Sequence, residues 1–138
     1  MRGRRIAFDY GDSRIGVAIC DPDGILATPL PFLDARHPKL MAQIGTLIDE
    51  YQPIRVYVGE PKMLSGNTST AVEKAEKFAD ALSKEFSLEI VMIDERLSTV
   101  DAARKLRESG ISARESKTLI DSMAAVAILE NGLAHEGK

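Results

Sequence analysis

The sequence contains a single cysteine, Cys20, and only two histidines, His37 and His135. One cysteine cannot form an internal disulfide, and because Cys20 lies in a β-like run we expect a small buried side chain rather than a reactive thiol. The two histidines have no metal-ligand spacing, which argues against a zinc site built from histidine and cysteine. These features are typical of a reducing compartment, and we expect a cytoplasmic protein.

Long apolar runs are also missing. The longest uncharged stretch, GILATPLPFL, is far shorter than the roughly 20 residues that a membrane-spanning helix needs. The start MRGRR has the positive charge of a signal peptide, but Asp9 and Asp12 interrupt the apolar segment that should follow it. Without repeats, low-complexity tracts or a linker, the 138 residues predict a single soluble domain over residues 1–138, with no membrane partner.

The net charge of −3 argues against a protein whose whole surface binds polyanions. The charge is uneven, however, because residues 96–117 carry an excess of basic side chains: Arg96, Arg104, Lys105, Arg107, Arg114 and Lys117. The N-terminus adds Arg2, Arg4 and Arg5. Such clusters are either solvated surfaces or a local phosphate-binding face, and their charge alone does not distinguish the two.

Hydrophobic spacing predicts the order β-β-β-α-β-α-β-α-α. The predicted strands cover residues 4–9, 15–20, 25–33, 54–59 and 89–94, and the first two helices cover 38–52 and 72–86. Two capping boxes, at Ser98 and Ser112, predict two further helices separated by Gly110. We therefore expect an α/β fold with a mixed five-stranded sheet, an antiparallel meander joined to parallel strands, and helices on both faces.

Three acidic residues occupy positions that are costly for a carboxylate. Asp121 lies on the apolar stripe of the last predicted helix, and Asp9 and Glu95 follow the ends of predicted strands, where ligand crevices form in open α/β sheets. Each also has an ordinary explanation: a pair with Lys117 for Asp121, a turn for Asp9, and a helix N-terminus for Glu95. In the expected sheet, however, all three converge on one edge.

Three carboxylates about 5 Å apart repel by roughly 3 kcal/mol per pair at an effective dielectric constant near 20, so the cluster requires a cation. An all-oxygen ligand set favours Mg²⁺ or Mn²⁺ over zinc. Carboxylate clusters with such ions typically hydrolyse phosphodiester bonds. The sequence therefore predicts Asp9, Glu95 and Asp121 as metal ligands and catalytic residues of a hydrolase.

Four segments in order, DYGDSRIGVAICDPDG, VGEP with a following SG, IDERLSTVDA and IDSMAAVAIL, resemble the YqgF/RuvX family of bacterial nucleases. That resemblance covers nearly the whole chain. It implies an RNase H-like fold, divalent-metal hydrolysis of nucleic acid, a cytoplasmic location and a role in maturing the 5′ end of 16S ribosomal RNA. It also implies the catalytic acids Asp9, Glu95 and Asp121.

The resemblance further implies substrate-binding residues. Gly11 and Arg14 belong to the first motif, where a glycine permits close approach of the backbone and an arginine reaches a phosphate. Arg96, Ser98 and Thr99 belong to the third motif, and Lys117 adds to the basic segment. The family typically reads VGLP where this chain has Glu60, which leaves open a fourth metal ligand or a substitution at the start of a loop.

Other functions are also compatible with the sequence. The first motif also fits DxGxxxxG, a phosphate loop of actin-like ATPases, but those proteins need two such domains. The same metal centre would serve a Holliday junction resolvase acting on four-way DNA, which should be a two-fold dimer, or an RNA nuclease active as a monomer or homodimer. A third alternative is a catalytically silent protein that binds structured RNA or the ribosome.

Overall fold

The computed structural model describes residues 2–60, 70–94 and 113–136, with side chains in the last helix described from Ser122 onward. These residues form the strands β1 (Arg5–Tyr10), β2 (Arg14–Cys20), β3 (Ala27–Asp34), β4 (Arg55–Glu60) and β5 (Glu89–Asp94), and the helices α1 (Leu40–Tyr51), α2 (Thr70–Glu85) and α4 (Ala113–Glu136). No helix in these ranges is long and apolar enough to span a membrane. The strands match the sequence prediction closely. The helix predicted after Ser98 lies outside the described residues, as does the predicted cap Ser112, and α4 is described from Ala113.

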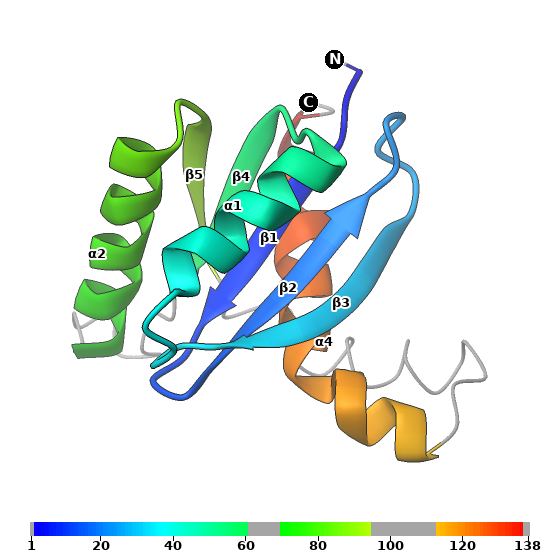
Figure 1. Cartoon of the computed structure of the whole chain (residues 1–138). Coiled ribbons are helices and arrows are strands. Elements are labelled where there is room, and N and C mark those ends of the chain that lie inside the picture. The colour runs from blue at the N-terminus through cyan, green and yellow to red at the C-terminus, as the bar shows by residue number, and fades with distance from the viewer. Residues whose placement is uncertain (1, 61–69, 95–112, 137–138) are drawn as a thin grey trace.

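The five strands form one mixed sheet in the order β3-β2-β1-β4-β5 (Figure 1). Strands β1, β2 and β3 pair antiparallel, whereas β4 pairs parallel with both β1 and β5. The carboxyl ends of β1, β4 and β5 consequently lie at the same edge of the sheet. This arrangement confirms the predicted meander with parallel strands added to it.

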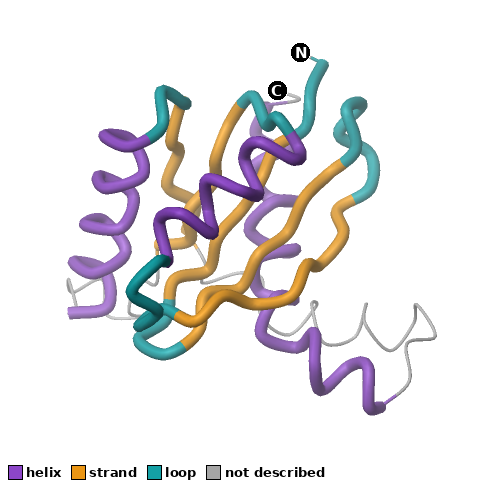
Figure 2. Tube along the Cα trace, viewed as in Figure 1, coloured by secondary structure: helices purple, strands orange, loops and turns teal. Residues whose placement is uncertain are grey.

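Helices cover both faces of the sheet, as Figure 2 shows. Successive side chains of each strand point to opposite faces of the sheet, so they pack in two separate cores. One core packs beneath α1 and α2 and includes Phe8, Val58 and Phe78. The other core packs beneath α4 and includes Ala7 and Tyr57. We name the two faces the α1/α2 face and the α4 face.

Helix α1 begins slightly later than the sequence suggests. The helix predicted over residues 38–52 starts at Leu40, because a turn closed by the Leu40 N–H on the His37 carbonyl precedes it. Its other end agrees with the predicted end at residue 52: Gln52 adopts a left-handed conformation with φ of 52°, and its N–H donates to the Ile48 carbonyl.

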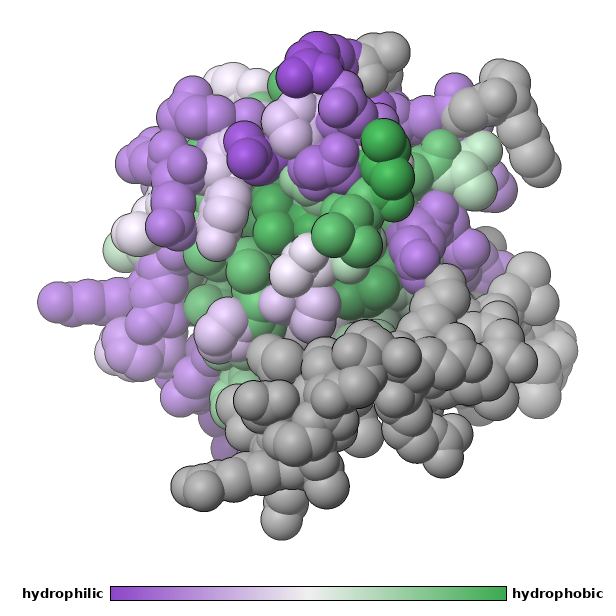
Figure 3. Space-filling model, turned by 90° about the vertical axis from the view of Figure 1, so that its right-hand side faces the viewer, coloured by the Kyte–Doolittle hydropathy of each residue, from purple (hydrophilic) through white to green (hydrophobic). Residues whose placement is uncertain are grey.

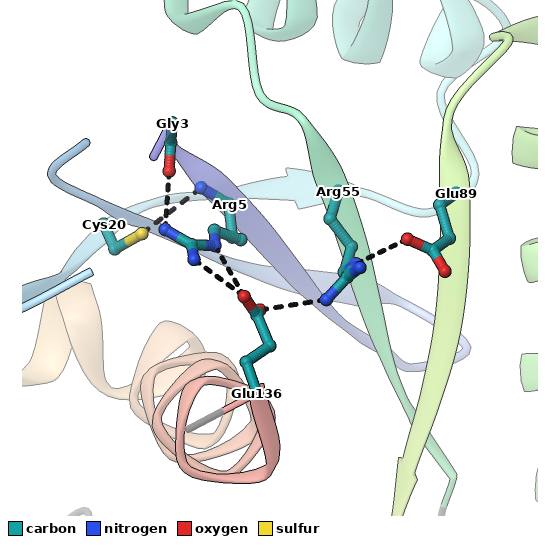
Figure 4. A network of polar contacts seen from close by, with 6 residues as sticks. All are labelled: Gly3, Arg5, Cys20, Arg55, Glu89 and Glu136. Carbon is teal, nitrogen blue, oxygen red and sulfur yellow. Dashed lines mark hydrogen bonds and ion pairs between the residues drawn. The ribbon is translucent and has the colours of Figure 1, made fainter. Parts of the chain in front are cut away.

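The end of the sheet opposite the carboxyl ends of β1 and β4 is held by a charge network (Figure 4). Glu136, the last residue of α4, pairs with Arg5 at 2.7 Å and with Arg55 at 3.3 Å, and Arg55 also pairs with Glu89 at 2.6 Å. Arg5 is only 4% exposed. Both alternatives for the N-terminal arginines, a solvated surface and a phosphate-binding face, are therefore wrong for Arg5, because its charge is buried against Glu136.

Candidate active site

Asp9 lies in the penultimate position of β1 and is half-buried. Its neighbours Phe8 and Tyr10 both pack against Phe78 of α2, with ring centroids 5.7 Å and 5.0 Å apart. Because successive strand residues point to opposite faces, Asp9 is directed to the α4 face. The backbone pairing of Asp9 with Gly16 of β2 holds the residue within the ladder.

Both strands beside Asp9 carry glycine at the same level. Gly16 is the paired residue on β2, and Gly59 directly follows Val58, the β4 partner of Phe8. Tyr57 belongs to the core under α4, so Gly59, two residues later, also lies on the α4 face. Neither neighbouring strand therefore adds a side chain beside the Asp9 carboxylate on this face.

Helix α4 is fixed at this level of the sheet by Ser122. The Val17 N–H donates to Ser122 Oγ at 3.1 Å, and the Ser122 hydroxyl donates to the Leu30 carbonyl at 2.5 Å. Ser122 is fully buried, and Val17 is the β2 partner of Phe8. Ser122 directly follows Asp121, and its contact with Val17 lies at the level of Phe8, one residue from Asp9. The hydroxyl thus fixes the helix backbone beside Asp121 close to the level of Asp9.

Of the three predicted catalytic acids, Asp9 is the one whose side chain the structure describes. Glu95 directly follows the last residue of β5 but lies outside the described residues, and Asp121 lies in α4 with its side chain outside them. Within the described part of the chain, no group of three or more metal-ligating side chains occurs. The metal cluster therefore remains a prediction.

Glu60 is the residue for which the sequence leaves open a role as a fourth metal ligand. It ends β4 and pairs with Asp94 of β5. Val56 and Val58 belong to the core under α1 and α2, so alternation places Glu60 on that same face, opposite Asp9. This position favours the interpretation of Glu60 as a residue at the start of a loop.

The turn between β1 and β2 contains two predicted substrate-binding residues. A side chain at Gly11 would place its Cβ 2.7 Å from the Arg14 carbonyl oxygen, so the turn requires glycine for its own close approach. Arg14 is exposed, and its guanidinium lies 4.9 Å from the centre of the Phe32 ring of β3. Because Ile15 packs in the core under α1 and α2, Arg14 is directed to the α4 face with Asp9.

The same turn contacts a basic residue of α2 that the sequence did not single out. Lys74 Nζ of α2 lies 2.8 Å from Asp12 Oδ1, and both side chains are exposed. The hydrogen bond from Lys74 lowers the pKa of Asp12, and the same contact raises the pKa of Lys74. Spacing gives no signal for this contact, because 62 residues separate the two.

The remaining predicted substrate-binding residues fall outside the described side chains. Arg96, Ser98 and Thr99 lie outside the described residues, and Lys117 lies in α4 with its side chain outside them.

Cys20 agrees with the expectation of a small buried side chain, because it is 2% exposed and its Sγ accepts the Arg5 N–H at 3.2 Å. Burial also raises the pKa of the Cys20 thiol.

A family model described as "RuvX: Holliday junction resolvase" matches residues 3–135. The chain belongs to the RuvX family. RuvX relatives from Streptomyces coelicolor and Rhodococcus jostii, both named "Putative pre-16S rRNA nuclease", are 44% and 47% identical to it. The alignments cover 98% and 96% of this chain, and 82% and 78% of those relatives.

Solved structures agree on the fold. The RuvC protein of Thermus thermophilus, determined in complex with a Holliday junction substrate, is similar with a TM-score of 0.57 at 14% identity, over 97% of this chain and 96% of that one. A second structure of that RuvC gives a TM-score of 0.56 at 15% identity, with the same coverage. This RuvX chain therefore has the RNase H-like architecture that the resemblance implied, and its family identifies it as a nuclease.

Proposed function

We propose that the chain is a divalent-metal-dependent nuclease that hydrolyses phosphodiester bonds with Asp9, Glu95 and Asp121 as its acids. The observation that carries this proposal is the placement of Asp9: a carboxylate held in a strand ladder, on the face covered by α4, between Gly16 and Gly59. Strand pairing fixes such an oxygen rigidly, which a metal-dependent site needs. Membership of the RuvX family supports the same chemistry.

The donor set fits Mg²⁺ or Mn²⁺, because carboxylate oxygens are the ligands these ions prefer. Asp9 offers its carboxylate from β1, Asp121 would approach from α4, which Ser122 docks onto β2 and β3, and Glu95 would follow from the end of β5. When bound, a divalent ion activates a water and offsets charge on the leaving oxygen.

Residues of the chain position the scissile strand. Arg14 is directed to the same face as Asp9, where its guanidinium can pair with a backbone phosphate. Gly11 keeps the turn compact against the Arg14 backbone. We assign Arg96, Ser98, Thr99 and Lys117 to further phosphate contacts on the basis of motif and charge.

The substrate that we favour is pre-16S rRNA, because relatives that the chain covers for most of their length are named "Putative pre-16S rRNA nuclease". Processing of its 5′ end in the cytoplasm is what the family resemblance adds to this proposal. The alternative is resolution of four-way DNA junctions, supported by the description of the family and by the likeness to RuvC in fold. A resolvase must cut two strands symmetrically and should therefore be a two-fold dimer, whereas an RNA nuclease can act as a monomer or homodimer.

One cleavage assay tests the proposal. A precursor rRNA leader and a synthetic four-way junction are incubated side by side with Mg²⁺ or Mn²⁺ and the purified chain, with Asp9→Asn and Asp23→Asn as matched variants. Asp23 pairs with Arg2 on the surface, away from Asp9. We expect metal-dependent cleavage of the leader that Asp9→Asn abolishes and Asp23→Asn retains.

Two other outcomes decide between the alternatives. Cleavage confined to the junction would assign the chain to DNA resolution. Binding of the RNA without cleavage, equal in the parent and in Asp9→Asn, would identify a catalytically silent RNA-binding protein.

A further inference from the structure

An exposed aromatic ring lies on the edge strand of the sheet. Figure 3 views the molecule from the side of β3, where hydrophobic side chains gather. Among the exposed large hydrophobic residues of the described chain, Ile25 and Leu26 precede β3, and Phe32, 36% exposed, lies within it. An aromatic side chain on a solvent-facing edge offers a flat stacking surface.

Phe32 sits at a bulge that faces Asp9 across β2. Val17 pairs with Leu30 and Ile15 pairs with Leu33, so Pro31 and Phe32 together oppose the single residue Gly16. Gly16 is also the β1 partner of Asp9. Two strand spacings, about 10 Å in total, therefore separate the backbone of Phe32 from that of Asp9.

The ring lies on the same face as the candidate acid. Leu30 and Leu33, on either side of the bulge, pack in the core under α1 and α2, whereas the Phe32 ring contacts Arg14, which is directed to the α4 face. The distance of 4.9 Å from the guanidinium carbon to the ring centre is a cation–π contact. Phe32, Arg14 and Asp9 consequently share one face at the same end of the sheet.

Ring and guanidinium together match the chemistry of a single nucleic-acid strand. Proteins that bind single strands stack unpaired bases on aromatic rings and on arginine planes, and pair the backbone with positive charge. Both components are exposed here. The contact adds little to folding stability at such an exposed site, so packing alone gives a weak reason for it.

We propose that Phe32 and Arg14 form a stacking platform for an unpaired base of the substrate strand, a few nucleotides from the bond that is cut. This inference rests on the proposed nuclease function and adds the form of its substrate: single-stranded nucleic acid beside the scissile phosphate. A base that reaches this surface meets either the ring or the guanidinium plane, and both stack on it. Stacking is tolerant of base identity, because every base has a π-face.

The absence of tryptophan from the sequence permits a direct test. Phe32→Trp introduces one fluorophore at the platform, and Ile54→Trp introduces one at a site with the same exposure of 36% next to the start of β4, at the other end of the sheet. Each variant is titrated with oligouridylate in EDTA, so that no cleavage occurs. We expect saturable quenching in Phe32→Trp and none in Ile54→Trp.

Affinity measurements complete the test. Phe32→Ala should weaken binding of oligouridylate by about 5- to 100-fold without changing the salt dependence, whereas Phe32→Tyr should retain the affinity. Arg14→Gln should lower the salt slope, because one phosphate contact is lost. A blunt RNA duplex should bind equally to the parent and to Phe32→Ala, since its bases are already stacked.

The outcomes separate the platform from the nuclease. Equal quenching at both positions, or an unchanged affinity in Phe32→Ala, would overturn the platform even if the parent cleaves RNA normally. Selective quenching in Phe32→Trp would support the platform even if the cleavage assay fails, and in that case the nuclease proposal alone would fall.

Discussion

Two buried hydroxyl groups illustrate how differently single residues contribute to this fold. Ser122 satisfies a backbone donor and a backbone acceptor at the β2–β3 bulge. The hydroxyl of Tyr57 is buried and has no hydrogen-bond partner within the described residues. A buried polar group stabilises a protein only if it is paired, so the two should respond oppositely to removal.

We expect Ser122→Ala to lower the free energy of unfolding by about 1–3 kcal/mol, because the Val17 N–H and the Leu30 carbonyl lose their shared partner. Tyr57→Phe should leave stability unchanged or raise it by up to about 1 kcal/mol, because it removes an unpaired group. Urea unfolding followed by circular dichroism measures both. A larger loss in Tyr57→Phe than in Ser122→Ala would contradict this account.

At the level of single residues, the sequence singled out Asp9 as a candidate acid but neither Ser122 nor Lys74. Asp9 could be identified from the sequence because an acid at the end of an apolar strand is unusual by itself. The role of Ser122 depends on a bulge between β2 and β3, and that of Lys74 on a contact with Asp12 across the fold. Neither the bulge nor the contact produces a recognisable residue spacing in the sequence.

Strands and helices were largely predictable, because alternation and helical spacing record which face each residue buries. Sequence reasoning did less well at the ends of elements. Arg5 looked like a member of a basic N-terminus, but the structure buries it against Glu136, 131 residues away. Long-range pairing of this kind depends on where α4 ends relative to β1, which local patterns do not contain.

The network at the end of α4 leads to a prediction at the scale of elements. Glu136→Gln should lower the free energy of unfolding by about 3 kcal/mol, because the buried charge of Arg5 loses its carboxylate and Arg55 keeps only Glu89. The matched change Asp23→Asn, which breaks the exposed pair with Arg2, should cost at most about 1 kcal/mol.

Urea unfolding at low and high salt measures this difference. The loss in Glu136→Gln should persist in 1 M salt, since buried pairs are screened weakly, whereas any effect of Asp23→Asn should vanish. A salt-sensitive or negligible loss in Glu136→Gln would show that α4 is held by its apolar face alone.

For the whole molecule, the two faces of the sheet have distinct roles. The α1/α2 face buries apolar side chains of β1 and β4, namely Phe8, Tyr10 and the valines of β4. This packing leaves Asp9, Arg14 and Phe32 on the α4 face. Because a one-residue shift in register would exchange the faces, the apolar pattern of β1 determines where the acid points. Core packing and the proposed site are therefore products of the same alternation.

Metal binding should consequently appear as a gain in global stability. If Mg²⁺ or Mn²⁺ binds the folded chain through Asp9, a concentration 100 times the dissociation constant adds about 2.7 kcal/mol to the free energy of unfolding, which thermal melting detects as a rise of several degrees. Asp9→Asn should lose this rise. Without metal it should melt at the same temperature as the parent or higher, because repulsion among the acids falls.

Glu60→Gln is the matched control, since Glu60 is also a strand-end acid but lies on the opposite face. It should keep the full rise with metal. An equal rise in all three proteins would mean that the ion binds elsewhere, whereas a loss in Glu60→Gln alone would assign the ion to the α1/α2 face. The dependence of the melting temperature on metal concentration therefore tests the placement of the acid through the stability of the entire fold.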